Sequence, residues 1–185
     1  MSESVQAETR VNRIKDAIGA IPDFPKKGIL FRDIFPMIRN PQMMKDCVDL
    51  LAEHIKEKYG QVDVIVGLEA RGFLFGPMVA QQLNAAFVPI RKKGKLPGDV
   101  VKVTYTLEYG EDVFEAQKGS VKQGETVVII DDLLATGGTM NAAVKLMQDM
   151  GANVKEGLVV IELTDLKGRD KVSCNMHSLV QFEGE

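Results

Sequence analysis

The sequence lacks long apolar runs and has little cysteine or histidine. No run of 18 apolar residues occurs, and the first ten residues, MSESVQAETR, are polar. We therefore expect neither a transmembrane helix nor a secretion signal, and we expect a cytoplasmic protein without a membrane partner. The chain has two histidines and two cysteines, Cys47 and Cys174, which stand far apart. This scarcity indicates reduced thiols and argues against a His-rich metal cage.

An excess of positive charge and two common nucleotide-binding motifs are also missing. The formal net charge is −3, which argues against nucleic acid as a partner. Neither GxxxxGK[ST] nor GxGxxG occurs. With 185 residues, 45% of them hydrophobic and 26% charged, the composition fits one globular domain over residues 1–185.

Strand patterns alternate with helix patterns along the chain. Val11, Ile14 and Ile18 have helical spacing. Asn40-Pro41 is typical of an N-cap and first turn, and we expect that second helix to end at Gly60. Further helices are predicted at 73–83 and 139–150, strands at 62–67, 85–90, 127–130, 157–163 and 178–182, and a hairpin at 101–107 and 111–117. This order predicts an α/β fold with a mostly parallel central sheet flanked by helices.

Residues 127–139 read VVIIDDLLATGGT, an apolar run that leads into two carboxylates and a glycine-containing turn. A buried strand here would bring Asp131 and Asp132 to the carboxyl edge of the sheet, where ligands bind in open α/β folds. The turn precedes a helix, and N–H groups at a helix N-terminus suit a phosphate. The acid pair suits sugar hydroxyls or a divalent cation. We expect a side chain at Gly137 to fill the phosphate site without disrupting the fold.

Basic side chains occur at two places where a polyphosphate could bind. Arg71 follows the first parallel strand in GLEARG, and an arginine there could hold phosphate oxygens in a bidentate way. Residues 91–98 read RKKGKLPG, which concentrates positive charge at Arg91, Lys92, Lys93 and Lys95. An ordinary surface arginine and a solvated charge run are the alternatives.

Two more segments could contact a substrate. Glu108 ends an alternating strand in TYTLEYG, and an acid on a mobile loop could transfer a proton or stabilise a cationic transition state. Residues 23–35, DFPKKGILFRDIF, form a loop with one proline and one glycine that could sandwich a flat heterocycle. The alternatives are a solvent-facing glutamate and a loop whose apolar residues plug the core.

Together the segments resemble one family. FPKKGILFRDI, GLEARGFLFGP, RKKGKLPG, LEYG, VVIIDDLLATGGTMNAA and ELTDLKGR occur in the order found in adenine-specific members of the type I phosphoribosyltransferases, and the resemblance runs from about Ile14 to Phe182. It implies the type I phosphoribosyltransferase fold, with a small N-terminal hood and a flexible β-hairpin loop. The hood and first helix would occupy about 1–36, and the basic segment and catalytic loop about 91–120.

The resemblance implies transfer of the 5-phosphoribosyl group from phosphoribosyl pyrophosphate (PRPP) to adenine, giving AMP and pyrophosphate in purine salvage. Mg²⁺ would be the cofactor, bound mainly through PRPP with no direct protein ligand assigned. A homodimer is expected. Relatives also have a strained backbone in the segment that matches residues 69–72. The resemblance therefore predicts strain there, for example a non-proline cis peptide.

Residue roles follow from the matched motifs. Glu108 would be catalytic, and Tyr109 would belong to the flexible loop. The binding residues implied are Ala135, Thr136, Gly137, Gly138 and Thr139 for the 5-phosphate; Asp131 and Asp132 for the ribose and metal shell; Arg71, Arg91 and Lys95 for pyrophosphate, Arg91 and Lys95 at a dimer interface as in relatives; and Leu30, Phe31 and Arg32 for adenine.

Two other functions remain open on the sequence alone. A phosphoribosyltransferase for another base would share residues 127–139 but should lack GILFRD. A PRPP-sensing regulator would need an added basic surface for nucleic acid, and the segment before Ile21 is too short for a helix-turn-helix module. Measuring activity with a panel of bases would distinguish the first alternative from the adenine enzyme. PRPP binding without pyrophosphate release would favour the second alternative.

Overall fold

A seven-stranded sheet with the order β5-β6-β4-β3-β7-β8-β9 forms the centre of the molecule. The structure is a computed structural model that describes residues 3–107 and 110–183. Neighbours among β3, β4, β7, β8 and β9 pair in parallel, and the β5–β6 hairpin joins β4 in antiparallel pairing. The strands are β3 (Val64–Leu68), β4 (Ala86–Lys92), β5 (Val100–Leu107), β6 (Gly110–Gln117), β7 (Thr126–Leu134), β8 (Asn153–Leu163) and β9 (Asn175–Phe182).

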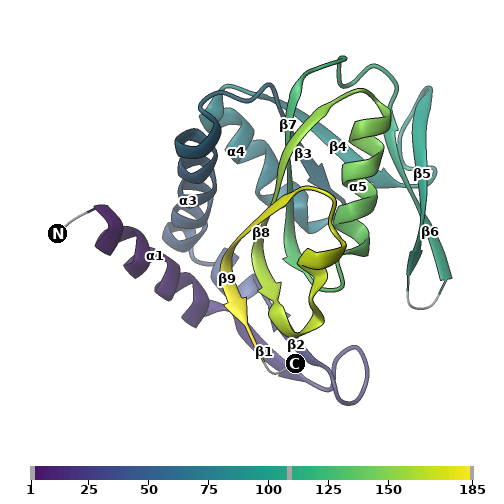
Figure 1. Cartoon of the computed structure of the whole chain (residues 1–185). Helices are drawn as coiled ribbons and strands as arrows, with labels where there is room; N and C mark the ends of the chain where they lie inside the picture. Colours follow the sequence, from purple (N-terminus) through teal and green to yellow (C-terminus); the bar gives the residue numbers. More distant parts are fainter. Residues whose placement is uncertain (1–2, 108–109, 184–185) are drawn as a thin grey trace.

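Helices cover both faces of this sheet (Figure 1). α3 (Pro41–Tyr59) and α4 (Gly76–Leu83) lie on one face, with α1 (Glu3–Ala17) beside α3 and β9. α5 (Gly138–Asp149) lies on the other face. Short turns of helix connect the rest: α2 (Phe35–Ile38), η1 (Arg71–Leu74), η2 (Thr164–Leu166) and η3 (Gly168–Lys171). No helix in the described part of the chain is long and apolar enough to cross a membrane.

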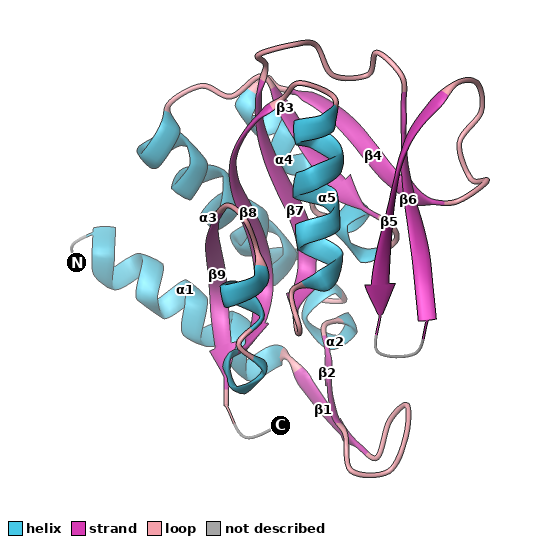
Figure 2. Cartoon of the chain, turned by 45° about the vertical axis from the view of Figure 1, so that its right-hand side comes forward, coloured by secondary structure: helices cyan, strands magenta, loops and turns pink. Residues whose placement is uncertain are grey.

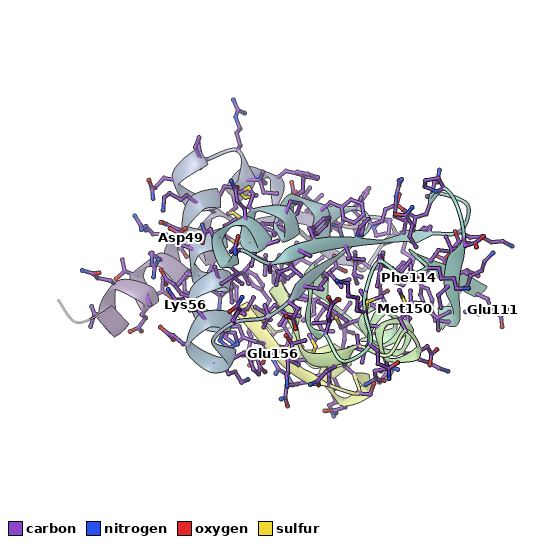
Figure 3. The ribbon with its side chains drawn as sticks, turned by 90° about the horizontal axis from the view of Figure 1, so that it is seen from above. Asp49, Lys56, Glu111, Phe114, Met150 and Glu156 are labelled. Carbon is purple, nitrogen blue, oxygen red and sulfur yellow. The ribbon has the colours of Figure 1, made fainter. Side chains whose placement is uncertain are left out.

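The continuous apolar run of β7 is explained by burial on both faces of the strand. Val128 and Ile130 pack in the cluster formed with α3 and α4, whereas Val127 and Ile129 pack in the cluster formed with α5. Parallel strands covered by helices on both sides need apolar residues at every position. β5 instead alternates, because Val103 is buried while Lys102 and Thr104 are exposed. Figure 3 shows Phe114 of β6 turned inward and Glu111 at the outer edge of the hairpin.

The predicted α/β architecture is confirmed, with local differences. Asn40 caps α3 by accepting hydrogen bonds from the N–H groups of Gln42 and Met43, and the helix ends before Gly60, as predicted. The helix predicted at 73–83 is divided into η1 and α4. β7 continues to Leu134, so the two aspartates lie inside the strand rather than in a loop after it.

The N-terminal segment predicted as a loop contains a two-stranded antiparallel sheet. β1 (Gly19–Pro22) pairs with β2 (Leu30–Asp33), and Figure 2 shows this pair beyond the carboxyl end of β9. Phe24 and Phe31 make an edge-to-face contact at a ring separation of 5.1 Å. The sequence signal failed because both strands are short and β1 ends in proline, which is disfavoured within a sheet.

Candidate functional site

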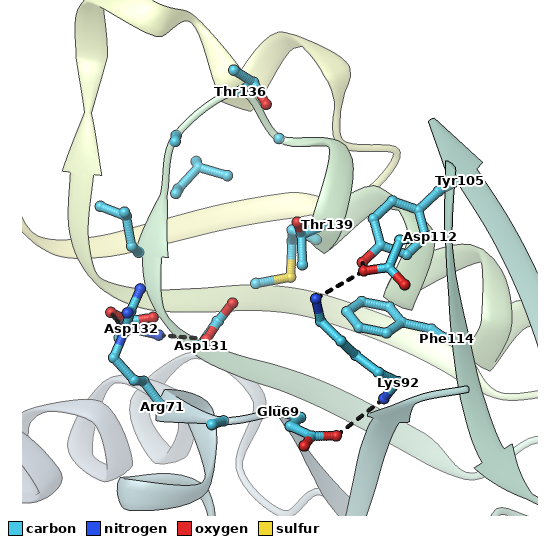
Figure 4. Close-up of a pocket in the computed structure, with 16 residues that line it drawn as sticks. Glu69, Arg71, Lys92, Tyr105, Asp112, Phe114, Asp131, Asp132, Thr136 and Thr139 are labelled. Atoms are coloured by element: carbon cyan, nitrogen blue, oxygen red, sulfur yellow. Dashed lines mark hydrogen bonds and ion pairs between the residues drawn. The ribbon is translucent and has the colours of Figure 1, made fainter. Parts of the chain in front are cut away.

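A cavity of about 330 Å³ opens at the carboxyl ends of β3 and β7. Its walls come from the turn after β3, the end of β4, the β5–β6 hairpin, the end of β7 and the start of α5 (Figure 4). The predicted site residues that line it are Arg71, Asp131, Asp132, Ala135, Thr136, Gly137 and Thr139. Two separately inferred segments, GLEARG and residues 127–139, are therefore brought to one cavity, at the edge where open α/β sheets bind ligands.

The acid pair and Arg71 form one wall of this cavity. The Nε atom of Arg71 lies 2.5 Å from Oδ2 of Asp132, which is almost fully buried. The backbone N–H of Asp132 donates to Oδ1 of Asp131 at 2.9 Å. Burial and the neighbouring carboxylate of Asp132 raise the pKa of Asp131 well above its ordinary value. A cation or a hydroxyl donor bound beside Asp131 would favour the ionised form of its carboxyl group. A metal ion would supply such a cation, and a sugar would supply such hydroxyl groups.

The turn from β7 into α5 forms a second wall. Gly137 has φ +83° and immediately precedes Gly138, the first residue of α5. The N–H groups in the first turn of a helix have no partner within the helix, so they are available to an anion. Gly138 belongs to this turn but is not among the residues that line the cavity.

Gly137 is also in backbone contact with the turn after β8. A Cβ atom on Gly137 would lie 2.1 Å from the carbonyl oxygen of Gly168, and one on Gly168 would lie 2.1 Å from that of Ala135. Arg169 anchors this turn by pairing with Glu162 and donating to a carbonyl of β9. The expectation that a side chain at Gly137 would spare the fold is therefore wrong, because its Cβ atom would collide with the backbone of Gly168. That it would prevent phosphate binding stays a prediction.

Arg91 and Lys95 do not line the cavity within this subunit. The guanidinium of Arg91 holds Glu69 through two hydrogen bonds of 3.1 and 3.0 Å, and it donates to the carbonyl of Lys95 at 3.0 Å. The pairing with Arg91 lowers the pKa of Glu69. The peptide between Glu69 and Ala70 is cis, which is the form of backbone that relatives led us to expect.

Lys92, Tyr105 and Asp112 also line the cavity. Lys92 was noted from the sequence only as part of the basic stretch 91–98, and Tyr105 and Asp112 were not singled out. The Nζ atom of Lys92 lies 2.9 Å from Oδ2 of Asp112, and the hydroxyl of Tyr105 donates to the same oxygen at 3.4 Å. Burial and the charge of Asp112 raise the pKa of Tyr105. The strand alternation of 101–107 could have indicated that Tyr105 faces inward with Val103. No comparable signal marked Asp112.

The remaining predicted residues lie outside this cavity or outside the described part of the chain. Leu30, Phe31 and Arg32 are on β2 and do not line this cavity. The guanidinium carbon of Arg32 lies 4.0 Å from the ring centre of Phe182. Glu108 and Tyr109 fall outside the described residues. Within the described part of the chain, no group of three or more Asp, Glu, His or Cys residues is placed to hold a metal ion.

Comparison with known proteins shows what this arrangement is similar to. The model of the phosphoribosyl transferase domain matches residues 37–179. The adenine phosphoribosyltransferase of Drosophila pseudoobscura pseudoobscura is 49% identical over 178 residues, which cover 96% of this chain and 98% of that protein. The Caenorhabditis elegans enzyme of the same name is 51% identical over 172 residues, covering 92% and 93%.

A solved structure agrees with these matches in fold. Adenine phosphoribosyltransferase from Saccharomyces cerevisiae, crystallised with adenine and an imino-altritol bisphosphate, superposes with a TM-score of 0.91 at 44% identity. The match covers 94% of this chain and 99% of the yeast chain. The chain therefore belongs to the adenine phosphoribosyltransferases of the phosphoribosyl transferase family.

Proposed function

We propose that this protein transfers the 5-phosphoribosyl group of PRPP to adenine, giving AMP and pyrophosphate in purine salvage. The observation that carries the proposal is the cavity in which a helix N-terminal turn, an acid pair and Arg71 meet. A phosphate group, a ribose and a pyrophosphate are the chemical parts that these three features suit. Near-complete coverage by adenine phosphoribosyltransferases supports adenine as the acceptor.

The backbone of residues 135–139 would hold the 5-phosphate, because it combines available N–H groups with close approach at Gly137. Asp131 and Asp132 would accept hydrogen bonds from the ribose hydroxyls. Arg71 would turn from Asp132 toward the pyrophosphate oxygens, which it can hold in a bidentate way. Departure of pyrophosphate leaves a cationic ribose, and these groups would stabilise both separated charges.

Mg²⁺ would bind mainly through the oxygens of PRPP. The carboxylates of Asp131 and Asp132 have the oxygen chemistry that Mg²⁺ prefers, although Arg71 already occupies one of them. The two carboxylates would therefore contact the ion mainly through its bound water molecules rather than as direct ligands. When bound, Mg²⁺ would neutralise charge on the leaving pyrophosphate.

Other residues would complete the site from outside the cavity walls. Glu108, which follows β5 in the sequence, would stabilise the cationic ribose or transfer a proton, and closure of a flexible loop with Tyr109 would exclude water. Leu30, Phe31 and Arg32 of the hood, within about 1–36, would recognise adenine largely through backbone atoms. A single catalytic domain of 1–185 in the cytoplasm is proposed, and the two free thiols fit a reducing compartment.

The proposal is tested by measuring pyrophosphate release from PRPP and Mg²⁺ with each purine base in turn. Adenine should have the highest kcat/KM, because a backbone acceptor at Leu30 would meet an exocyclic amine favourably but would leave a 6-oxo group facing a second acceptor. Equal values for adenine and hypoxanthine would overturn the adenine assignment. PRPP binding without pyrophosphate release from any base would overturn the transferase activity.

A further inference from the structure

The cavity is lined by more carboxylates than cations. Glu69, Asp112, Asp131 and Asp132 face two cations, Arg71 and Lys92. Each of these cations is already paired, Arg71 with Asp132 and Lys92 with Asp112. A site for a polyphosphate would be expected to offer unpaired cations, so the carboxylates must influence how strongly the ligand binds.

No proposed step of the reaction needs Asp112 or Glu69, but only Asp112 pairs with a cation that lines the cavity, because Glu69 pairs with Arg91 outside it. Asp112 lies on β6, opposite Tyr105 of β5 in the hairpin register. Its Oδ1 atom accepts a hydrogen bond from the N–H of Val113 at 2.8 Å, and its Oδ2 atom is shared by Lys92 and Tyr105. The side chain is 21% exposed, whereas that of Lys92 is 55% exposed. The carboxylate is therefore fixed, and the lysine is the mobile partner.

Lys92 can leave Asp112 without disturbing the strand that carries it. Its backbone N–H donates to Oε2 of Glu69 at 3.1 Å, which anchors the main chain. The long flexible side chain ends in an ammonium that can reorient, unlike a planar guanidinium. Figure 4 shows Lys92 extending from β4 across the cavity toward Asp112.

We propose that Asp112 is a positioning residue that holds Lys92 in the empty cavity and competes with the pyrophosphate group for it, thereby weakening pyrophosphate binding and speeding its release. This inference rests on the proposed function, since it concerns the leaving group of that reaction. A fixed negative charge beside a bound polyanion raises the free energy of the complex, and it does so most at low ionic strength.

The test is titration calorimetry of Mg²⁺–pyrophosphate and of PRPP with the wild type and Asp112→Asn. Asparagine keeps the shape and can still accept from Val113, but it removes the charge. We expect roughly two- to tenfold tighter binding of pyrophosphate in low salt, a gain that shrinks as salt is added. Glu111→Gln is the matched control, because it removes one charge from the exposed neighbouring position at the outer edge of the same strand.

A second pair of variants separates electrostatics from structural change. In Lys92→Met, the further change Asp112→Asn should tighten binding less than it does in the wild type, because the partner for which Asp112 and the ligand compete is gone. Unchanged or weaker pyrophosphate binding by folded Asp112→Asn would overturn the inference while leaving the transferase proposal intact. Failure of the wild type to bind either ligand would overturn the proposed function and this inference with it.

Discussion

Two glycines in different loops determine the shape of the turn that is proposed to hold phosphate. Gly137 has a positive φ and no room for a Cβ atom, because Gly168 lies against it. At Gly119 the φ is similar, +80°, but a Cβ atom there would meet nothing within 4 Å. A side chain at either position would therefore carry the cost of a positive φ. Only at Gly137 would its Cβ atom also collide with backbone.

This contrast gives a prediction at the residue scale. Gly137→Ala should lower the free energy of unfolding by about 1–3 kcal/mol more than Gly119→Ala, which is the usual cost of overpacking. It should also weaken PRPP binding, whereas Gly119→Ala should not. Chemical denaturation and calorimetric titration of both variants would measure these effects. Equal stability of the two variants, with PRPP binding lost only in Gly137→Ala, would show instead that the side chain enters the anion site.

Sequence reasoning identified residues whose chemistry is local and missed those whose role depends on a distant partner. Asp131, Asp132 and the turn that follows were predicted because their spacing after an apolar run is itself the signal. The contact between Gly137 and Gly168 joins two loops, and no local pattern reports it. Asp112 was missed for the same reason, since only the hairpin register places it opposite Tyr105.

At the scale of elements, the amino end of β8 carries a buried acid. Glu156 is 0% exposed, and its carboxylate lies 2.8 Å from Nε2 of His54 and 2.7 Å from Nζ of Lys58, both on α3. His177 of β9 stacks on His54 at a ring separation of 3.7 Å. Burial, with the neighbouring His54, lowers the pKa of His177 to about 4. Lys58 and Arg169 also disfavour its charged form, and Glu156 opposes them.

The lowered pKa predicts an acid-sensitive junction between α3 and β9. The unfolded chain binds a proton at His177 below about 6.5, whereas the folded chain does so only near 4. Stability from this group is therefore complete at neutral pH and is lost as the pH falls from about 6.5 to about 4. His177→Gln should show a shallower fall of Tm over that range. Parallel curves for variant and wild type, with both folded at neutral pH, would contradict the assignment.

Element prediction succeeded where apolar periodicity is strong and failed where strands are short. The parallel strands and α3, α4 and α5 were located from the spacing of apolar residues and from capping residues. The pair β1–β2 was read as a loop because each strand has four residues, and the connecting segment of 23–29 gives no tight-turn signal. The order of the strands in the sheet was not predicted, because it depends on pairing between distant segments that no single segment reports.

At the scale of the whole molecule, the positions of Arg91 and Lys95 favour an assembly. Both lie outside the cavity of their own subunit, although the resemblance assigns them to pyrophosphate. Large apolar side chains at Phe35, Leu74 and Met78 are also exposed. A symmetric dimer could cover apolar surface and bring these cations to the partner's cavity.

We therefore predict a homodimer in solution. Light scattering at working concentration should give twice the 20.4 kDa mass of one chain. Arg91→Ala should raise the KM for PRPP while the dimer persists. A fully active monomer would contradict both the dimer and the role of Arg91 across its interface.

The placement of the two histidines has a consequence for how the reaction responds to acidity. His54 and His177 are the only histidines of the chain, and they meet near the amino ends of β8 and β9. The cavity opens at the opposite, carboxyl edge of the same sheet. Within a subunit, imidazole therefore has no access to the cavity, whereas carboxylates, Lys92 and Tyr105 line it. A titration of the rate near neutrality would then report a group of the cavity or of the substrates rather than an imidazole, and it should persist when both histidines are replaced by glutamine.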